Sequence, residues 1–484
     1  MAWADESEYY KMVTVMTSNS PTPSRPETRR PGDDLALEVS GLTPLSDGRL
    51  AVATRKGDVW FLNDIYDDPP KNVTYHRFAR ALHEPLGLVQ HGDSLYVAQR
   101  SELTRLRDTD GDDVADEYLT VGKGWGVTGN YHEYAYGPKL DRDGNFWITL
   151  NIGIGDRLNS DDRWRGWGVK ITPAGDLVPV CSGMRSPCGL GSNLAGDMFF
   201  TDQQGEWIGT CSLHHMQRGV FFGNPEGLSS ANLPGSMLKG IGEIPSGHTW
   251  PQALKQIPQL RPPAIWLPYK KMGQSATDVL CDTTGGKFGP FAGQLFVGEF
   301  SLATINRVFL EQVDGRYQGA CFPFRQGFAS AVVRMTFGRD GSMFVGLTNR
   351  GWSSIGTAAS GLQRLVWTGK TPFEIKEMRA CHDGFELVFT KPVDAATAAD
   401  PRSFAISSYT YLLHKKYGSD EVLRKTLAII KSSVSEDGLR ARLSVQGLRE
   451  GFVHELQCPG VQSCDGEKLL HDDAYYTLNR IPRH

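Results

Sequence analysis

Three features are scarce in this chain of 484 residues: long apolar runs, surplus positive charge and paired cysteines. No stretch approaches the roughly 18 to 20 uninterrupted apolar residues that a membrane helix requires. Fifty-one basic residues against 55 acidic ones give a formal charge of -4, so there is no cationic surplus to hold a phosphate backbone. We therefore expect no membrane span in this chain and no nucleic-acid partner.

The eight cysteines are few for this length, and none are spaced as CxxC or CxxCH. This spacing excludes a c-type haem on this chain and argues against a thiolate zinc site. Cys458 and Cys464 flank a Gly-containing loop and are the candidates for a disulfide, which would suit an exported location. The first residues, MAWADESEYYKMVTV, have no basic region followed by an apolar core, so no signal peptide is visible.

Short strand signals recur along most of the chain behind Gly or Asp-Gly turns. The signals begin at Asp47, Gly92, Asp143, Gly196, Gly293 and Asp340. Each reads as a turn, a strand, a turn and a second strand, at a step of roughly 45 to 55 residues. The step is broken only across 225–290, a Pro-rich insertion that we expect to fold over one face. This pattern predicts an all-β fold, a six-bladed β-propeller with seven blades as the fallback, whose function lies at one mouth of the central channel.

The composition divides the chain into three predicted parts. Residues 1–35 are an N-terminal lead and linker, because 17–35 are rich in Pro, Ser and charge. Residues 36–370 are the propeller. Residues 371–484 alternate apolar and polar positions without the propeller turns, which predicts a small immunoglobulin-like β-sandwich. Because every candidate side chain precedes residue 371, we expect this sandwich to be dispensable for chemistry.

The segment RDTDGDDVADE (107–117) carries closely spaced carboxylates around Gly111. Hard oxygen ligands on a tight loop suit Ca²⁺, and the spacing resembles the calcium loops of thrombospondin type 3 repeats rather than an EF-hand. The alternative is a solvated acidic hairpin turn. We predict a structural calcium site whose ligands are Asp108, Asp110, Asp112 and Asp116.

Three loops between predicted inner strands hold the candidates for chemistry. His132 lies in GNYHEYAYG, Arg185 in SGMRSPCGLG and Gln204 in TDQQGEW. A histidine flanked by tyrosines such as Tyr131 and Tyr134 is alternatively a packed, hydrogen-bonded side chain. A base, a cation and an amide on three converging loops favour a site over packing.

The order GNYHEYAYGPKLDRDGNFWITLNIGIGD, SGMRSPCGLG, then FFTDQQGEW with FFGNPEG behind it resembles the soluble glucose and sorbosone dehydrogenase family. Members of that family are six-bladed propellers that use pyrroloquinoline quinone. The chain resembles more closely the propeller proteins of this superfamily that are common in planctomycetes and verrucomicrobia. In that group the likeness includes LTRLRDTDGDDVADEY and the C-terminal part.

The resemblance implies a sugar oxidoreductase and assigns roles residue by residue. His132 matches the catalytic base, Arg185 the arginine beside the quinone, and Gln204 the glutamine of a QG turn. The carbonyls of Gly205 and Glu206 match those that hold the cofactor's Ca²⁺. The implied base takes the proton from a sugar hydroxyl while a hydride moves to the quinone. A cytochrome c acceptor and a periplasmic or secreted location also follow from the likeness.

The sequence departs from the family where the quinone's carboxylates are bound. Ser301 stands where the family has a lysine, and Arg334 lies one residue out of step with an arginine pair, although it remains the candidate there. Where this chain lacks the family's cations, it also lacks their charge-assisted hydrogen bonds to the quinone. Lys270, Lys271 and Arg325 are the neighbouring cations that could replace them.

Two other functions therefore stay open. A cofactor-free polysaccharide lyase or glycosidase would use His132 with Tyr131 or Tyr134 for proton transfer and Arg185 to neutralise a uronate carboxylate. A non-catalytic carbohydrate-binding propeller would stack sugar rings on tryptophans, for which the candidates are Trp125, Trp207 and Trp352.

Overall fold

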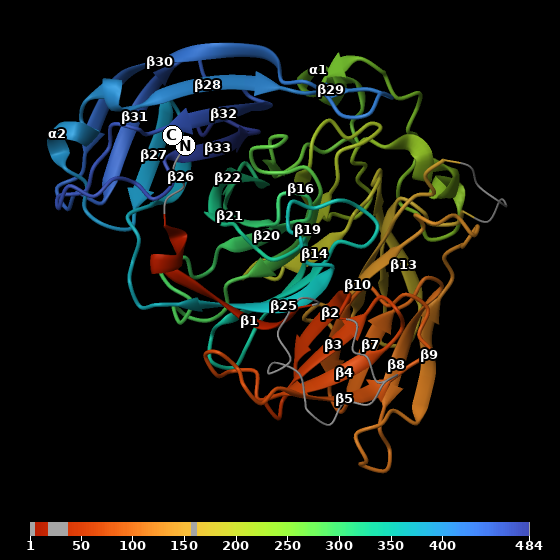
Figure 1. Cartoon of the computed structure of the whole chain (residues 1–484). Coiled ribbons are helices and arrows are strands. Elements are labelled where there is room, and N and C mark those ends of the chain that lie inside the picture. Colours follow the sequence, from red (N-terminus) through yellow and green to blue (C-terminus); the bar gives the residue numbers. More distant parts are fainter. Residues whose placement is uncertain (1–4, 18–36, 156–161, 484) are drawn as a thin grey trace.

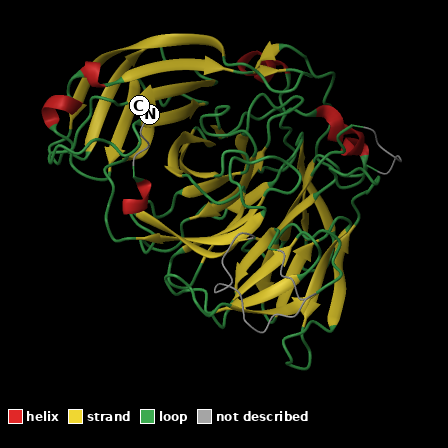
Figure 2. Cartoon of the chain, in the orientation of Figure 1, coloured by secondary structure: helices red, strands yellow, loops and turns green. Residues whose placement is uncertain are grey.

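The structure is a computed structural model that describes residues 5–17, 37–155 and 162–483. The all-β prediction is confirmed, because strands dominate and the helices are short (Figure 2). Within the described ranges, none of the helices has the length and apolar character needed to cross a membrane. The helices are η1 (Glu6–Glu8), η3 (Pro225–Asn232), α1 (Trp250–Gln256), α2 (Ala395–Ala398) and η4 (Pro401–Ser403).

Five antiparallel sheets have four strands each. In the first two, the strands follow one another in chain order: β2 (Val39–Pro44), β3 (Leu50–Thr54), β4 (Val59–Asn63) and β5 (Thr74–Ala79), then β6 (Leu88–His91), β7 (Ser94–Ala98), β8 (Glu102–Arg107) and β9 (Glu117–Lys123). The third sheet is also sequential: β10 (Ala135–Leu140), β11 (Phe146–Leu150), β12 (Trp167–Ile171) and β13 (Leu177–Ser182).

The other two four-stranded sheets each take one strand from outside the local repeat. The fourth sheet is β14 (Gly189–Ser192), β15 (Met198–Asp202), β16 (Ser212–His215) and β18 (Ile265–Trp266). Its last strand comes from the Pro-rich insertion. The fifth sheet is β23 (Val332–Phe337), β24 (Met343–Thr348), β25 (Ser360–Trp367) and β1 (Tyr10–Thr17).

Strand β1 lies inside the segment predicted to be an N-terminal lead. It pairs with β25 from Tyr10↔Trp367 to Thr17↔Gly361, and it buries one face, including Val13 and Val15. The apolar alternation of YYKMVTVMT favours a strand, and pairing with β25, from the last sheet of the ring, provides its hydrogen bonds. Residues 18–36, which include most of the predicted linker, lie outside the described residues.

Apart from the two-stranded pair β17 (His248–Thr249) and β29 (Leu412–Leu413), the remaining strands form one sheet of eleven. It starts with β19 (Ala276–Cys281), β20 (Leu295–Glu299), β21 (Thr304–Val313) and β22 (Arg316–Arg325), and then passes into the C-terminal strands through the pairing of β22 with β33. In sheet order these are β33 (Asp473–Leu478), β32 (Phe452–Gln457), β28 (Ala405–Thr410), β30 (Val422–Val434), β31 (Arg440–Gln446), β27 (Gly384–Phe389) and β26 (Ile375–Cys381).

The long strand β30 joins the two halves of the C-terminal part. Its first half pairs with β28 and its second half with β31, and the two halves enclose one hydrophobic cluster. These strands form the blue layer in Figure 1, where β28 points toward α1. Beside α1, β29 (Leu412–Leu413) pairs with β17 (His248–Thr249) of the insertion.

The sheets are arranged in a propeller-like ring. The first strands contact one another in the cyclic order β2, β6, β10, β14, β19, β23 and back to β2. All six line one narrow cavity of about 20 Å³, room for about one water molecule. The ring therefore has a packed axis, and open space for a ligand has to come from the loops at its ends.

Candidate functional site

The candidate side chains lie on loops at the same end of the ring. Arg55 follows β3, Arg100 follows β7 and Gln204 follows β15, whereas His132 and Arg185 precede β10 and β14. Because strands in each sheet alternate in direction, the loop after a second strand and the loop before a first strand leave the same end. We call this end the mouth.

Two arginines that the sequence interpretation missed organise one side of the mouth. Arg55 Nε lies 3.0 Å from one oxygen of Glu84, and Arg100 is paired with the other. Arg55 Nη2 also donates to the hydroxyls of Tyr131 and Tyr134, both at 2.8 Å. Although burial opposes it, Arg100 and Arg55 lower the pKa of Glu84, so it stays ionised between them.

The two tyrosines in this network differ in burial. Tyr131 is 51% exposed, and its hydrogen bond with Tyr134, followed by the charge of Arg55, lowers the pKa of its phenol. Burial instead raises the pKa of Tyr134. Only Tyr131 therefore combines access to solvent with an acidified hydroxyl.

His132 is half-buried between these tyrosines and the arginines. Its ring meets the Tyr131 ring edge-on at a centroid distance of 5.2 Å. Its backbone N–H donates to Asn130, but no hydrogen bond or ion pair holds a ring nitrogen within the described part of the chain. Burial first, and then the charges of Arg185, Arg100 and Arg55, lower the pKa of His132. The imidazole is therefore neutral at pH 7 and free to accept a proton.

Arg185 closes the other side of the mouth. Its backbone N–H donates to the buried carboxylate of Asp202 at 2.9 Å, which fixes the loop, and burial raises the pKa of Asp202 to about 6. Arg185 as a whole is only 6% exposed, and its guanidinium donates to Glu206 at 2.8 Å. After burial, the charge of Arg185 contributes most to lowering the pKa of His132, so these two predicted residues are electrostatically coupled.

The loop Gln204–Gly205–Glu206 packs under Arg185. A Cβ at Gly205 would lie 2.0 Å from Arg185 Nε, so the guanidinium crosses the chain there only because the residue is glycine. Gln204 donates its amide to the carbonyl of Gly209 at 3.2 Å. The structure therefore places this loop against Arg185.

The backbone carbonyls predicted to hold Ca²⁺ at the mouth have protein partners. The carbonyl of Gly205 accepts the N–H of Gly418 at 3.0 Å, and that of Glu206 accepts Nδ2 of Asn224 at 3.2 Å. Gly418 belongs to the C-terminal part. The expectation that this part stands clear of the chemistry does not fit these contacts.

Arg334 occupies the channel instead of the mouth. Its guanidinium is 5% exposed and donates to four backbone carbonyls, those of Ser40, Leu86, Cys188 and Val333. Asp278 lines the same cavity and accepts the N–H of Met335. Arg334 is therefore bound to the backbone around the channel, including the residues just before β6 and β14.

Two of the other three cations weighed for the quinone are also paired, whereas Lys270 is exposed and its Nζ lies 5.3 Å from the centroid of the Tyr269 ring. Lys271 lies 3.0 and 2.8 Å from Glu421 and Glu455, and Arg325 lies 2.8 Å from Glu6. The hydroxyl of Ser301 is buried without a hydrogen-bond partner, and it offers no charge. Lys271, Arg325 and Arg334 are thus bound to protein partners, which disfavours pyrroloquinoline quinone as the family holds it.

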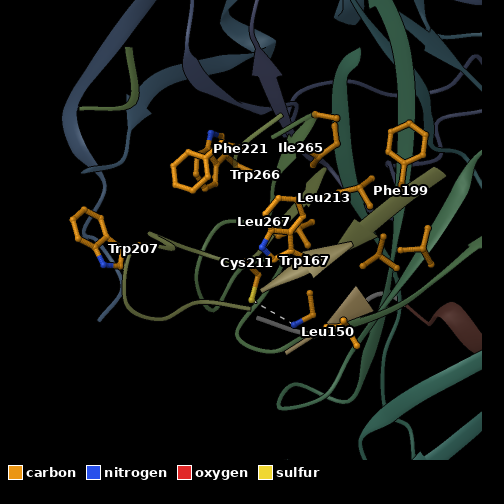
Figure 3. Packing of buried hydrophobic residues seen from close by; sticks show 14 of the residues in the cluster. Leu150, Trp167, Phe199, Trp207, Cys211, Leu213, Phe221, Ile265, Trp266 and Leu267 are labelled. Atoms are coloured by element: carbon orange, nitrogen blue, oxygen red, sulfur yellow. Dashed lines mark hydrogen bonds between the residues drawn. The ribbon is translucent and has the colours of Figure 1, made fainter. Parts of the chain in front are cut away.

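The tryptophans proposed for sugar stacking differ in access. Trp125 is buried, and its Nε1 donates to the carbonyl of Arg100 at 2.7 Å. Trp207 is buried at the edge of a hydrophobic cluster with Trp266 and Phe221, as Figure 3 shows. Trp352 is 59% exposed. Of the three, only Trp352 offers an open ring.

The predicted calcium loop lies at the opposite end of the ring. It joins β8 to β9, and that connection leaves the sheet at the end away from the mouth. Asp108, Asp110 and Asp116 place carboxylate oxygens within 4.8 Å of one another, whereas Asp112 accepts the N–H of Val114 instead. The loop offers three of the four predicted ligands and cannot serve a cofactor at the mouth.

Cys458 and Cys464 are free thiols. Cys458 is buried, and the Sγ of Cys464 lies 3.2 Å from the carbonyl of Val393. The disulfide considered from their spacing is therefore not formed, because local hydrogen bonding directs the exposed thiol elsewhere.

Comparisons with known proteins agree with this architecture. Residues 39–232 match a family described as a domain of unknown function, DUF7133, a stretch that contains His132, Arg185 and Gln204. The comparison with curated proteins gives no match.

Among solved structures, a protein described as an oxidoreductase (glucose dehydrogenase) from Thermus thermophilus is similar over 74% of this chain and 100% of its own, with a TM-score of 0.51 and 17% identity. The PQQ-bound aldose sugar dehydrogenase of Streptomyces coelicolor is similar over 74% of this chain and 98% of its own, with a TM-score of 0.46 and 14% identity. The apo aldose sugar dehydrogenase of Escherichia coli is similar over 74% of this chain and 99% of its own, with a TM-score of 0.48 and 13% identity. At such identities the first likeness establishes a shared sugar-oxidoreductase-like fold and no more.

Proposed function

We propose that the mouth binds an anionic sugar and that His132 removes a proton from it as a general base. The observation that carries this proposal is a half-buried imidazole whose ring nitrogens have no hydrogen-bond or ion-pair partner among the described residues, set among Arg55, Arg100 and Arg185. A lowered pKa keeps the base deprotonated at neutral pH. Glu84 and Glu206 pair with these three arginines, so the group keeps one surplus positive charge that attracts a carboxylate on the substrate.

A uronate is the substrate for which this arrangement is best suited. An arginine that neutralises the carboxylate acidifies the neighbouring C–H, and His132 takes that proton. The C–O bond at the next carbon then breaks, a C=C bond forms, and the departing sugar oxygen gains a proton from Tyr131 or water. The elimination is redox-neutral and needs no cofactor. Tyr131 suits the second transfer, because its hydroxyl is exposed and its pKa is lowered.

A quinoprotein sugar dehydrogenase is the second candidate. It is supported by the sugar-oxidoreductase-like fold and by the meeting of His132 with Arg185 beside the loop of Gln204. The paired state of Arg334 and Lys271 counts against it. Pyrroloquinoline quinone, a cytochrome c acceptor and an exported location stay predictions under this candidate.

We also propose that β19–β22 form a sixth blade and that β26–β33 form an immunoglobulin-like sandwich. The support for the first is the cyclic contact of six inner strands, and for the second the two strand groups around one core. In this description the blade and the sandwich share an edge at β22 and β33.

The test compares His132→Asn with His91→Asn, an exposed histidine on β6 at the other end of the ring. Polygalacturonate and alginate are the probes, and ultraviolet absorbance follows the new C=C bond. Turnover should fall about 10²-fold in His132→Asn and stay unchanged in His91→Asn. If uronates are inert, and pyrroloquinoline quinone with Ca²⁺ gives a bound quinone spectrum and aldose oxidation, the second candidate replaces the first.

A further inference from the structure

A loop of the C-terminal part, His414–Ser419, lies directly on the mouth. Three main-chain hydrogen bonds fasten it to the 205–209 loop: Trp207 N–H to His414 O at 2.9 Å, Gly418 N–H to Gly205 O at 3.0 Å, and Ser419 N–H to Gly209 O at 2.7 Å. The backbone of this loop is therefore fixed against the same segment that packs under Arg185.

The other side of this loop is anchored by the insertion. Strand β29, just before it, pairs with β17, and the N–H of Trp250 donates to Tyr411 O at 3.1 Å. The N–H of Lys415 donates to Ser246 Oγ at 3.2 Å. With both flanks held, the loop is a fixed wall of the mouth.

Tyr417 projects from this wall next to the candidate site. Its backbone forms a bridge with Glu206, and its ring lies 5.3 Å from the Arg185 guanidinium carbon. The side chain is nevertheless 57% exposed. Gly418 has a φ of +62°, and a Cβ there would lie 2.7 Å from the Gln204 amide nitrogen, so glycine permits the turn that holds Tyr417 in place.

We infer that Tyr417 is a specificity-determining residue that stacks on a sugar ring while that sugar's carboxylate meets Arg185. An exposed ring with a fixed backbone gains free energy when a ligand's apolar face covers it, and little side-chain entropy remains to be lost. The Arg185 guanidinium lies over one face of the Tyr417 ring, and its positive charge selects an acidic sugar over a neutral one. This inference rests on the proposed function, since it assigns a carbohydrate to the same mouth.

The consequence is that the C-terminal part supplies a wall of the binding site. The propeller loops carry the base and the cation, and a residue more than two hundred positions later along the chain completes the platform.

Calorimetric binding of trigalacturonate, with maltotriose as the neutral probe, tests this on the full chain. Tyr417→Ala should weaken trigalacturonate binding about tenfold, and Tyr417→Phe should keep it within about threefold because the ring remains. Tyr118→Ala is the matched control: that tyrosine is 45% exposed on β9, away from the mouth, and binding should not change. Circular dichroism checks that each variant folds.

The outcomes separate this inference from the proposed function. Equal binding by Tyr417→Ala and Tyr118→Ala overturns the role of Tyr417, even if His132→Asn abolishes turnover. Binding that depends on Tyr417 together with full turnover in His132→Asn supports the platform and removes the proposed base. If trigalacturonate binds no better than maltotriose, or neither binds, the acidic-sugar assignment is wrong.

Discussion

Arg334 in the channel and Arg185 at the mouth are both buried arginines, with exposures of 5% and 6%, yet their surroundings differ. Arg334 directs its N–H groups at four backbone carbonyls of neighbouring strands. Arg185 meets Glu206, whose side chain is 46% exposed, and the open ring of Tyr417. Burial alone therefore does not mark a functional cation, whereas a partner that solvent or substrate can reach does.

Two histidines repeat the contrast. His471 is partly buried between Glu374 at 2.7 Å and Glu6 at 3.1 Å, and it ties the N-terminal residues to the C-terminal part. The ring nitrogens of His132 have no hydrogen-bond or ion-pair partner among the residues described. The first is a satisfied structural group, and the second is open to a ligand.

The largest expected effect comes from Arg334→Met. Removing this buried cation leaves the carbonyls unpaired near Asp278, so the free energy of unfolding should fall by about 3–5 kcal/mol. Arg185→Met should cost only about 1 kcal/mol, because water can reach Glu206. Urea denaturation measures both. Equal losses in the two variants would contradict the contrast between channel and mouth.

His471 should make stability depend on alkaline pH. Burial alone would lower the pKa of His471, but Glu374 and Glu6 outweigh it and raise it to about 9. Because the pKa of His471 is higher in the folded than in the unfolded protein, protonation of His471 stabilises the fold. This stabilisation is complete below the unfolded pKa of about 6.5 and is lost as the pH rises through about 9.

Urea titrations from pH 6.5 to 10 measure that linkage. His471→Gln should lower the free energy of unfolding by about 2 kcal/mol at pH 6.5 and have little effect at pH 10. His382→Gln, an exposed histidine 3.7 Å from Asp383, is the control and should show no such window. A constant difference across the pH range would remove the proposed ionic clamp.

His132 should set an acid limb in the activity. Because its pKa is lowered, kcat/KM should be flat near neutral pH and fall about tenfold per pH unit below a midpoint under about 6.5. Arg185→Met removes a positive charge, so the midpoint should move to higher pH. The pH profile of kcat/KM measures this, and a midpoint unaffected by Arg185→Met would argue against their coupling.

The smallest expected effect is chelation at the far end of the ring. If Asp108, Asp110 and Asp116 hold Ca²⁺, excess EGTA should lower Tm slightly and added Ca²⁺ should restore it. Asp110→Asn should abolish the response, whereas Asp112→Asn should keep it, because Asp112 is not among the three carboxylates that cluster within 4.8 Å. Calorimetry with elemental analysis decides; an unchanged curve and no metal would remove the site.

Part of the missed site was present in the repeats. Arg55 and Arg100 close the matching stretches LAVATR and LYVAQR, so aligning the second strands would have placed both at one end of the ring. Glu84 and Tyr417 carry no such signal. Their roles depend on contacts with distant residues, which local patterns do not report.

The sequence by itself determined the repeated strands, the all-β architecture and the loops that carry His132, Arg185 and Gln204, because strand periodicity and turn residues are local properties. Only the tertiary structure decided that β1 joins β25, that Arg334 serves the channel, and that Tyr417 returns to the mouth. These depend on long-range packing and hydrogen bonding, since a buried donor takes whichever acceptor the assembled ring places within reach.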